Sequence, residues 1–387
     1  MKEEGKNLLV ADENVLKYLG SVPCEVNCRV MQSVDDLNDC DLFLTHSEYH
    51  DDYIDKILKA KSAGVRTALI PDGIFEWRNS FEHPPRCGSG VGQEVWNGIV
   101  SDYFLAFGDY QKAIINAYSP QTKVEVIGVP RLEKMISDYA VRNFKKIQSE
   151  DINILIASAK TAGFCQYDSK AFVDCCLDLK KYFSRIPENL GVNANLMWRV
   201  SERVSVEIGL TDDEVNSGKG ALLDVLEEAD AVFSGPSTLL LEAMLMKKPV
   251  VLLDYTGSPV SVNCAWNIFS AEHIEAVVVD LLLMREERLK FQEMSLRNHI
   301  CFSCDPSASL LHFIHTEPES RKAEASQCVD PNASLLIENN YLRNRLNRAE
   351  VTYEERLEHL SELVSLRDSE IKYKLPFGWR LTKPRSF

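Results

Sequence analysis

Short apolar runs alternate with amphipathic stretches through the first third of the chain. Continuous apolar runs of this length are typical of strands buried on both faces of a parallel sheet. The predicted strands cover residues 7–11, 40–45, 65–70, 102–106 and 124–127. Apolar residues at helical spacing predict helices over 53–63 and 110–118. Strands that alternate with helices predict a parallel sheet covered by helices on both faces.

The same alternation resumes in the second half of the chain. The pattern predicts strands over 152–157, 195–200, 231–233 and 250–253, and helices over 172–183, 221–228 and 281–294. Between the two halves, residues 133–150 are polar with helical spacing, which indicates an interdomain linker. We therefore predict a domain over residues 1–132, a linker over 133–150 and a second domain over 151–316.

Residues 229–254 predict a strand, a tight turn, a helix and a further buried strand. Gly235-Pro236 indicates the turn, and Ser237 is a candidate N-cap for the helix. Unpaired N–H groups at such a turn can bind an anion at the carboxyl edge of a sheet. We hypothesise that Gly235, Ser237 and Thr238 bind a nucleotide phosphate. The alternative is an ordinary capped crossover helix.

This segment resembles the nucleotide-sugar-binding segment of glycosyltransferases with the two-Rossmann-domain architecture called GT-B. The family pattern G-x-S-x-x-x-x-E-A-M followed by K-P-V-V is matched at Gly235, Ser237, Glu242, Ala243, Met244, Lys248, Pro249, Val250 and Val251. The resemblance implies that Glu242 bonds the nucleotide ribose. Many retaining members carry a further Glu where this chain has Ser234, so their mechanism is not carried over.

The end of the first domain carries a second resemblance. Transferases of bacterial surface polymers show F-G-x-x-Q and then G-x-P-R, matched here at Phe107, Gly108, Gln111, Gly128, Pro130 and Arg131. Together the resemblances imply an α/β fold of two Rossmann-like, doubly wound domains of GT-B type.

The chain beyond the second domain changes in composition. Residues 317–332 are polar and predict a linker. Residues 333–370 carry a heptad pattern that predicts a C-terminal coiled-coil helix for self-association or a partner protein, the alternative being a helix packed on the body. The basic and aromatic tail 371–387 suggests an anionic membrane surface, or else a boundary between modules. Its W-R-L-T-x-P run, from Trp379 to Pro384, resembles a segment found after coiled coils in polysaccharide glycosyltransferases.

Composition narrows the class of function. The net charge of −15 argues against a general nucleic-acid-binding protein, which needs a basic face. The 11 cysteines follow no regular framework, and no secretory leader is evident, so we expect reduced thiols in the cytoplasm. No apolar run approaches the ~20 residues that span a bilayer. Peripheral attachment at the inner face of the membrane is the corresponding expectation for the tail.

Glycosyl transfer needs a site for the leaving nucleotide and a group that takes the acceptor proton. Catalytic candidates follow strands of the first domain: Asp72, which is the preferred base, Glu76 and His46. Ser158 and Lys160 follow the first strand of the second domain, and Arg199 ends its next strand. These three are candidate phosphate ligands, although an ordinary surface role for Arg199 and a turn role for Asp72 are the alternatives.

Metal binding is not expected at this site. Cys301-x-x-Cys304 and His312-x-x-His315 have zinc-like spacing, but such residues near terminal helices are more often structural. The prediction is a metal-independent GT-B glycosyltransferase with no cofactor, which moves a sugar from a nucleotide-sugar donor to a lipopolysaccharide or capsule glycan. The alternatives are a glycerophosphotransferase or a sugar-nucleotide 2-epimerase on the same fold, and a non-catalytic coiled-coil scaffold.

Overall fold

The structure is a computed structural model of the 387-residue chain. It describes residues 6–20, 22–48, 51–76, 96, 98–145, 147, 151–159, 166–185 and 192–316. The predicted linker 317–332, coiled coil 333–370 and tail 371–387 lie outside the described residues, as does Lys160. Within those ranges, no helix is both long and apolar enough to cross a membrane.

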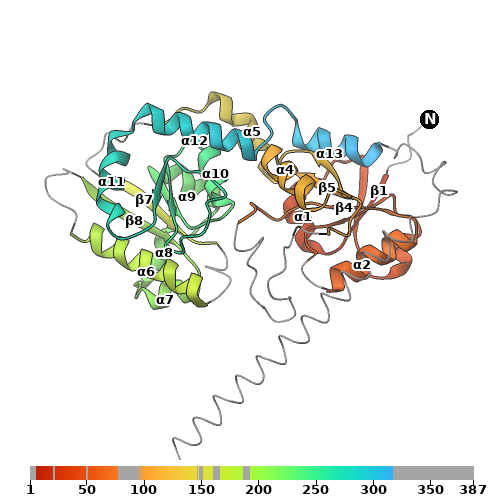
Figure 1. The fold of residues 1–387 in the computed structure, drawn as a ribbon, viewed down its shortest axis with the longest axis horizontal. Helices are drawn as coiled ribbons and strands as arrows, with labels where there is room; N and C mark the ends of the chain where they lie inside the picture. Colours follow the sequence, from red (N-terminus) through yellow and green to blue (C-terminus); the bar gives the residue numbers. More distant parts are fainter. Residues whose placement is uncertain are drawn as a thin grey trace, which may run out of the picture.

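The first domain is built on a parallel sheet of six strands within the described residues (Figure 1). Its order is β2-β1-β3-β4-β5-β6. The strands are β1 (Lys6–Val10), β2 (Val26–Val30), β3 (Leu42–Thr45), β4 (Arg66–Leu69), β5 (Tyr103–Ala106) and β6 (Lys123–Val126). Helices α1 (Glu13–Leu19), α2 (Asp51–Ser62) and α4 (Asp109–Tyr118) connect them, with the 3-10 helix η1 (Val34–Leu37). The predicted strands are confirmed, whereas β2 was not predicted because polar residues interrupt it.

The second domain has a parallel sheet of five strands among the described residues, ordered β11-β10-β9-β7-β8. The strands are β7 (Asp151–Ala157), β8 (Asn193–Arg199), β9 (Ala231–Ser234), β10 (Val250–Leu253) and β11 (Trp266–Ile268). The connecting helices are α6 (Gln166–Phe183), α7 (Glu202–Glu207), α8 (Asp212–Ser217), α9 (Leu222–Glu228), α10 (Leu239–Leu245) and α11 (His273–Leu283). The two sheets share one strand order. Starting at β2 in the first sheet and at β8 in the second, each sheet places the second strand of its domain at one edge, then the first, third, fourth and fifth strands.

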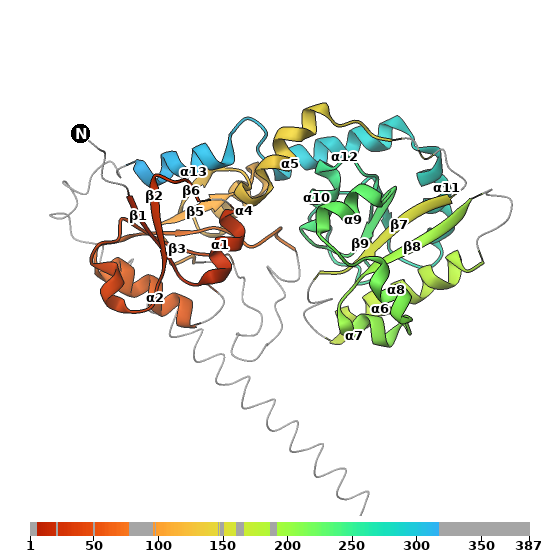
Figure 2. The same ribbon diagram turned by 180° about the vertical axis from the view of Figure 1, so that it is seen from behind.

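The chain passes twice between the domains, along one side of the molecule (Figures 1 and 2). The outward passage runs through η2 (Pro130–Leu132), α5 (Glu133–Asp138) and η3 (Tyr139–Val141). The helix expected over 133–150 thus ends early, and its Met135, Ile136 and Tyr139 are buried. This segment packs into the second domain because it carries an apolar face among its polar residues.

The return passage runs through α12 (Glu286–His299) and α13 (Pro306–His315). Although α13 falls within the predicted second domain, it packs on the first sheet, and its Leu310, Phe313 and Ile314 join that core. Buried Arg66 donates hydrogen bonds to the carbonyls of Phe313, Ile314 and Thr316 at 2.7–3.0 Å. A guanidinium at a helix C-terminus satisfies carbonyls that have no partner within the helix.

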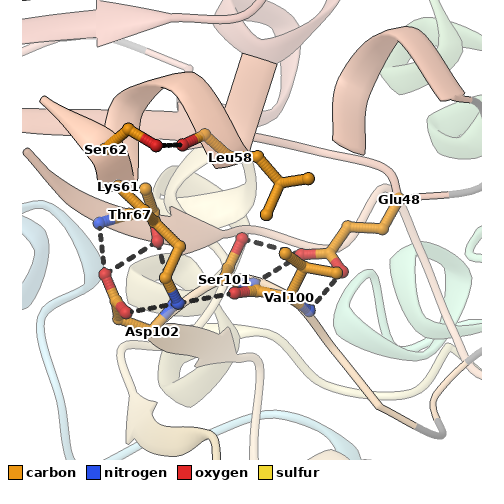
Figure 3. Close-up of polar contacts among 8 residues, drawn as sticks. All are labelled: Glu48, Leu58, Lys61, Ser62, Thr67, Val100, Ser101 and Asp102. Carbon is orange, nitrogen blue, oxygen red and sulfur yellow. Dashed lines mark hydrogen bonds and ion pairs between the residues drawn. The ribbon is translucent and has the colours of Figure 1, made fainter. Parts of the chain in front are cut away.

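Polar contacts also fix the segment that leads into β5 (Figure 3). The Glu48 carboxylate accepts hydrogen bonds from the Val100 and Ser101 backbone N–H groups and from the Ser101 hydroxyl at 2.7–3.0 Å. Lys61 donates to the Val100 carbonyl and pairs with Asp102 at 2.7 Å. These contacts fix the segment that enters β5 to the loop after β3 and to the last turn of α2.

The two domains share a buried core. Phe107 and Val129 of the first domain belong to the same apolar cluster as Leu240, Met244 and Ile300. Shared apolar burial of this kind holds two domains in a defined relation. The carboxyl edges of the two sheets consequently meet at a fixed interface.

Candidate active site between the two sheets

The strand order of each sheet identifies its ligand-binding position. In an open α/β sheet, ligands bind beyond the carboxyl ends of the strands, where the strand order reverses. The reversal in the first sheet lies between β1 and β3, and in the second sheet between β7 and β9. Loops that follow these strands therefore form the candidate site.

The first reversal point carries an acid and a histidine. Asp12 follows β1 and His46 follows β3, and the register that pairs Val10 with Leu44 brings both to one level. His46 Nδ1 lies 3.9 Å from Asp12 Oδ1. The Tyr53 hydroxyl donates a hydrogen bond to the other Asp12 oxygen. His46 also stacks on Tyr18 with ring centroids 5.3 Å apart and meets Tyr53 edge-on at 5.2 Å.

Asp12 has two structural tasks in addition to this contact. Its Oδ1 accepts hydrogen bonds from the Asn14 and Val15 N–H groups at 2.8 and 3.3 Å, and so caps α1. Partial burial opposes ionisation of Asp12, but the hydrogen bonds from Tyr53 and the backbone and the charge of His46 outweigh it and lower its pKa. Asp12 is therefore a fixed carboxylate that can stabilise a protonated His46.

Asp72 follows β4 on the same edge, as its position after a buried run predicted. Its side chain keeps access to solvent. Surrounding protein atoms nevertheless desolvate the carboxyl and raise its pKa above the ordinary value, while the charges of His46 and Arg131 act in the opposite direction. A carboxyl group with a raised pKa in a crevice has the properties of a general base or acid.

Arg131 completes the first-domain side of the site. It follows β6, in η2, and its backbone lies against Gly20, the C-cap residue of α1: a side chain on Gly20 would come 2.9 Å from the Arg131 Cα. Gly20 has φ 69°, a conformation that glycine adopts without strain. Arg131 Nη1 pairs with Glu242 Oε1 of the second domain at 2.9 Å.

Glu242 is almost fully buried on α10, with its side chain 6% exposed. In this structure its carboxylate is bonded to Arg131 and so joins the two domains. The role in ribose binding that the family resemblance implies stays a prediction.

The turn after β9 faces the first domain, as the phosphate hypothesis requires. Helix α10 begins at Leu239 with Thr238 as its N-cap residue, so the prediction of Ser237 as N-cap is wrong by one residue. Thr238 Oγ1 accepts a hydrogen bond from the Ile74 N–H at 3.3 Å. A side chain at Gly73 would collide with this hydroxyl, so glycine allows the close approach. Ser237 and Ser234 hydroxyl oxygens lie 3.2 Å apart in the same turn.

The other predicted ligands of the second domain lie around its reversal point. Ser158 follows β7, and its hydroxyl accepts a hydrogen bond from the Ser201 N–H at 3.1 Å. Arg199 ends β8, but its Nη1 donates to the carbonyls of Gly218 and Gly220 at 2.9 and 3.2 Å. Arg199 thus fixes the loop before α9 by hydrogen bonds. This contact agrees with the alternative to phosphate binding, an ordinary surface role for Arg199.

Glu76 reaches toward the second domain. It lines a small pocket together with the turn and helix residues Pro236 and Leu240 and the loop from Asp254 to Val262. Like Asp72 it follows β4, but the other residues that line its pocket belong to the second domain. This position between the domains suits Glu76 to contact a substrate or to close the crevice. It suits Glu76 less well to the role of general base, which we assign to Asp72.

Asp12, Tyr18, Tyr53 and Arg131 were absent from the predicted site. A signal for Asp12 existed, because an Asp directly after a buried strand is the feature that selected Asp72. No cluster of three or more metal-ligating side chains is assembled in the part of the chain that the structure describes.

No protein-family model matches the sequence, and no curated protein matches it. Solved structures do match. A Listeria monocytogenes protein named as a UDP-N-acetylglucosamine 2-epimerase aligns with a TM-score of 0.53 and 12% identity, over 81% of this chain and 98% of its own. Staphylococcus aureus MnaA with UDP aligns with a TM-score of 0.50 and 14% identity, over 80% and 96%. This chain has the GT-B fold.

A variant of the wall teichoic acid polymerase TagF also aligns, with a TM-score of 0.49 and 11% identity, over 80% of this chain and 89% of its own. The predicted fold of two α/β domains is confirmed by the strand orders and by the first two matches.

Proposed function

We propose that the chain is a GT-B-type glycosyltransferase that binds a nucleotide sugar between its two sheets. The observation that carries this proposal is the grouping of Asp12 and His46, at the reversal point of the first sheet, with Asp72, which follows the neighbouring strand β4. The turn after β9 of the other sheet contacts the same segment, because Thr238 bonds the Ile74 N–H. UDP in the S. aureus structure makes a uridine nucleotide the first donor to test.

Asp72 is the proposed general base for the acceptor hydroxyl. Desolvation raises the pKa of Asp72 and makes its carboxylate a better proton acceptor near neutral pH. The charges of His46 and Arg131 act in the opposite direction and favour the ionised form of Asp72. Asp12 and Tyr53 act as positioning residues because they hold His46 from its Nδ1 side.

The second domain is proposed to hold the nucleotide. Backbone N–H groups and the hydroxyls of Ser158 and Ser237 can donate to phosphate oxygens, and neither residue adds a competing negative charge. Lys160 belongs to the same loop as Ser158 and stays a candidate ligand. A growing bacterial surface glycan is the proposed acceptor, by resemblance to polysaccharide transferases.

A sugar-nucleotide 2-epimerase is the second candidate. It is favoured by the L. monocytogenes match, which bears that activity in its name. Epimerisation requires a proton to leave and return at one carbon, and a carboxyl–imidazole pair can serve that reaction as well.

One experiment separates the two. The protein is incubated with UDP-N-acetylglucosamine in D2O, with and without a glycan acceptor, and the products are analysed by mass spectrometry and NMR. A transferase releases UDP in step with extension of the acceptor. An epimerase inverts C2 and incorporates deuterium there without any acceptor. If a panel of UDP-, CDP-, GDP- and dTDP-linked donors gives neither outcome, both candidates are rejected.

A further inference from the structure

The loop 300–305 carries two cysteines where the chain returns from the second domain to the first. It joins α12 to α13 and is neither helix nor strand. The Cys301 N–H donates to the Phe107 carbonyl, at the end of β5, at 2.9 Å. Cys304 Sγ lies against Gly128, where an added Cβ would approach it to 3.2 Å. The loop is thus anchored to the first domain at both cysteines.

The two cysteines lie close to each other within this loop. Cys304 Sγ lies 3.7 Å from the Cys301 carbonyl oxygen, and Cys301 Sγ lies 3.3 Å from the Ser303 hydroxyl oxygen. Both are half-buried, so a small reagent can reach them. By contrast, Cys175, Cys176 and Cys264 are fully buried in the second domain.

The surroundings make the two thiols unequal. Partial burial opposes ionisation of Cys301, but hydrogen bonds from the Cys304 thiol and from Ser303 outweigh it and lower its pKa. Burial and the neighbouring Cys301 raise the pKa of Cys304 to about 12. Cys-x-x-Cys pairs with one low-pKa thiol are typical of thiol–disulfide exchange, with that thiol attacking first.

We propose that Cys301 and Cys304 form a site of reversible thiol–disulfide exchange with low-molecular-weight disulfides. The Cys301 thiolate attacks one sulfur of the small disulfide, and the other sulfur leaves as a thiolate that takes a proton. Cys304 then loses its proton and attacks the Cys301 sulfur of the mixed disulfide, which releases the second thiol. The protein pair is oxidised by two electrons, and the small disulfide is reduced to two thiols.

The test uses the full chain and oxidised glutathione. After incubation, free thiols are alkylated and the protein is digested with trypsin. Cleavage after Arg297 and Arg321 yields a peptide, 298–321, that contains Cys301 and Cys304 and no other cysteine. We expect the oxidised peptide to carry no alkyl group and to be about 2 Da, the mass of two hydrogens, lighter than the unalkylated dithiol peptide. Treatment with dithiothreitol before alkylation should restore alkylation at both cysteines.

Single variants test the order of attack. Cys304→Ser is expected to retain glutathione on Cys301, while Cys301→Ser takes up glutathione on Cys304 at least about tenfold more slowly. Cys24→Ser, which removes an exposed thiol elsewhere, serves as the matched control and should leave the internal disulfide unchanged. Glutathione on Cys24 without an internal disulfide in peptide 298–321 would overturn the proposal, as would equal rates for the two single variants.

Discussion

The two sheet edges that face each other have the same strand order but opposite chemistry. The first-domain edge gathers ionisable groups: Asp12, His46, Tyr53 and Asp72. At the second-domain edge, the turn after β9 and the loop after β7 present the neutral hydroxyls of Ser234, Ser237 and Ser158. The nearby Arg199 and Glu242 are bonded to protein partners. We propose from this contrast a division of labour, in which the first domain supplies proton transfer and the second domain binds the donor.

The largest effect is expected from Asp72→Asn. Removal of a general base costs typically about 10²–10⁴-fold in rate, so we expect kcat to fall about 1,000-fold while nucleotide affinity changes less than about twofold. Because surrounding protein atoms desolvate Asp72 and raise its pKa in the folded state, its ionised form costs stability at neutral pH. The variant should therefore unfold at the same or a higher temperature. Asp39→Asn, at an exposed position, is the control, and a variant with full turnover would refute the assignment.

A smaller loss is expected when the support of His46 is removed. Tyr53→Phe deletes the hydroxyl that holds Asp12, and Asp12→Asn removes the charge while keeping a good N-cap for α1. We expect each to lower kcat about tenfold with little change in KM. The pH profile of kcat distinguishes a role in positioning His46 from a role in folding. A folding defect would lower kcat by the same factor at every pH and would not move the limbs of the profile.

The pH dependence should respond to Arg131. If Asp72 is the base, activity falls as pH falls through its raised pKa, so the acid limb lies above the ordinary Asp value of about 3.9. Arg131 lowers the pKa of Asp72, so removal of its charge moves the acid limb to higher pH. The pH profile of the double variant Arg131→Gln/Glu242→Gln is compared with that of Glu242→Gln alone. The single change Arg131→Gln is avoided because it would leave the buried Glu242 carboxylate unpaired, at a cost of about 3 kcal/mol in stability. If the acid limb of the pH profile does not move, Arg131 does not influence the pKa of the catalytic group.

The smallest effect is expected on the binding side. Ser237→Ala removes one hydroxyl from the turn after β9, and a single hydrogen bond contributes about 1 kcal/mol, or about fivefold in affinity. We expect that change in nucleotide Kd with kcat nearly unaltered. Ser258→Ala, in the loop after β10, provides a comparison at the same edge. If Ser237→Ala and Ser258→Ala weaken nucleotide binding equally, Ser237 has no specific role in binding the phosphate.

The sequence was sufficient to locate single strand ends but not the site that several of them form. Asp72 and His46 could be found because each follows closely on a short, mainly apolar run. Asp12 meets His46 because β1 and β3 are neighbours in the sheet. The local pattern of apolar residues predicts single strands but not their order. Tyr53 likewise reaches Asp12 only because α2 packs beside β3.

Residues between the domains were the least predictable. The pairing of Glu242 with Arg131 joins positions 111 residues apart, and only the packing of the two domains brings them together. The N-cap of α10 is Thr238 and not the predicted Ser237, and Thr238 contacts the Ile74 backbone of the first domain, a contact that local sequence does not indicate. On the first sheet, α13 packs through Leu310, Phe313 and Ile314 and meets buried Arg66, a residue that a buried strand pattern gives no reason to single out.

Calorimetric titration of UDP into the wild-type protein, Asp72→Asn and Ser237→Ala tests the division of labour most directly. The account predicts saturable binding at one site, with the same affinity in Asp72→Asn and an affinity about fivefold weaker in Ser237→Ala. Loss of UDP binding in Asp72→Asn with wild-type affinity in Ser237→Ala would contradict it. If the folded wild-type protein binds no nucleotide in the same titration with UDP, CDP, GDP and dTDP, the central claim fails and a scaffold role takes its place.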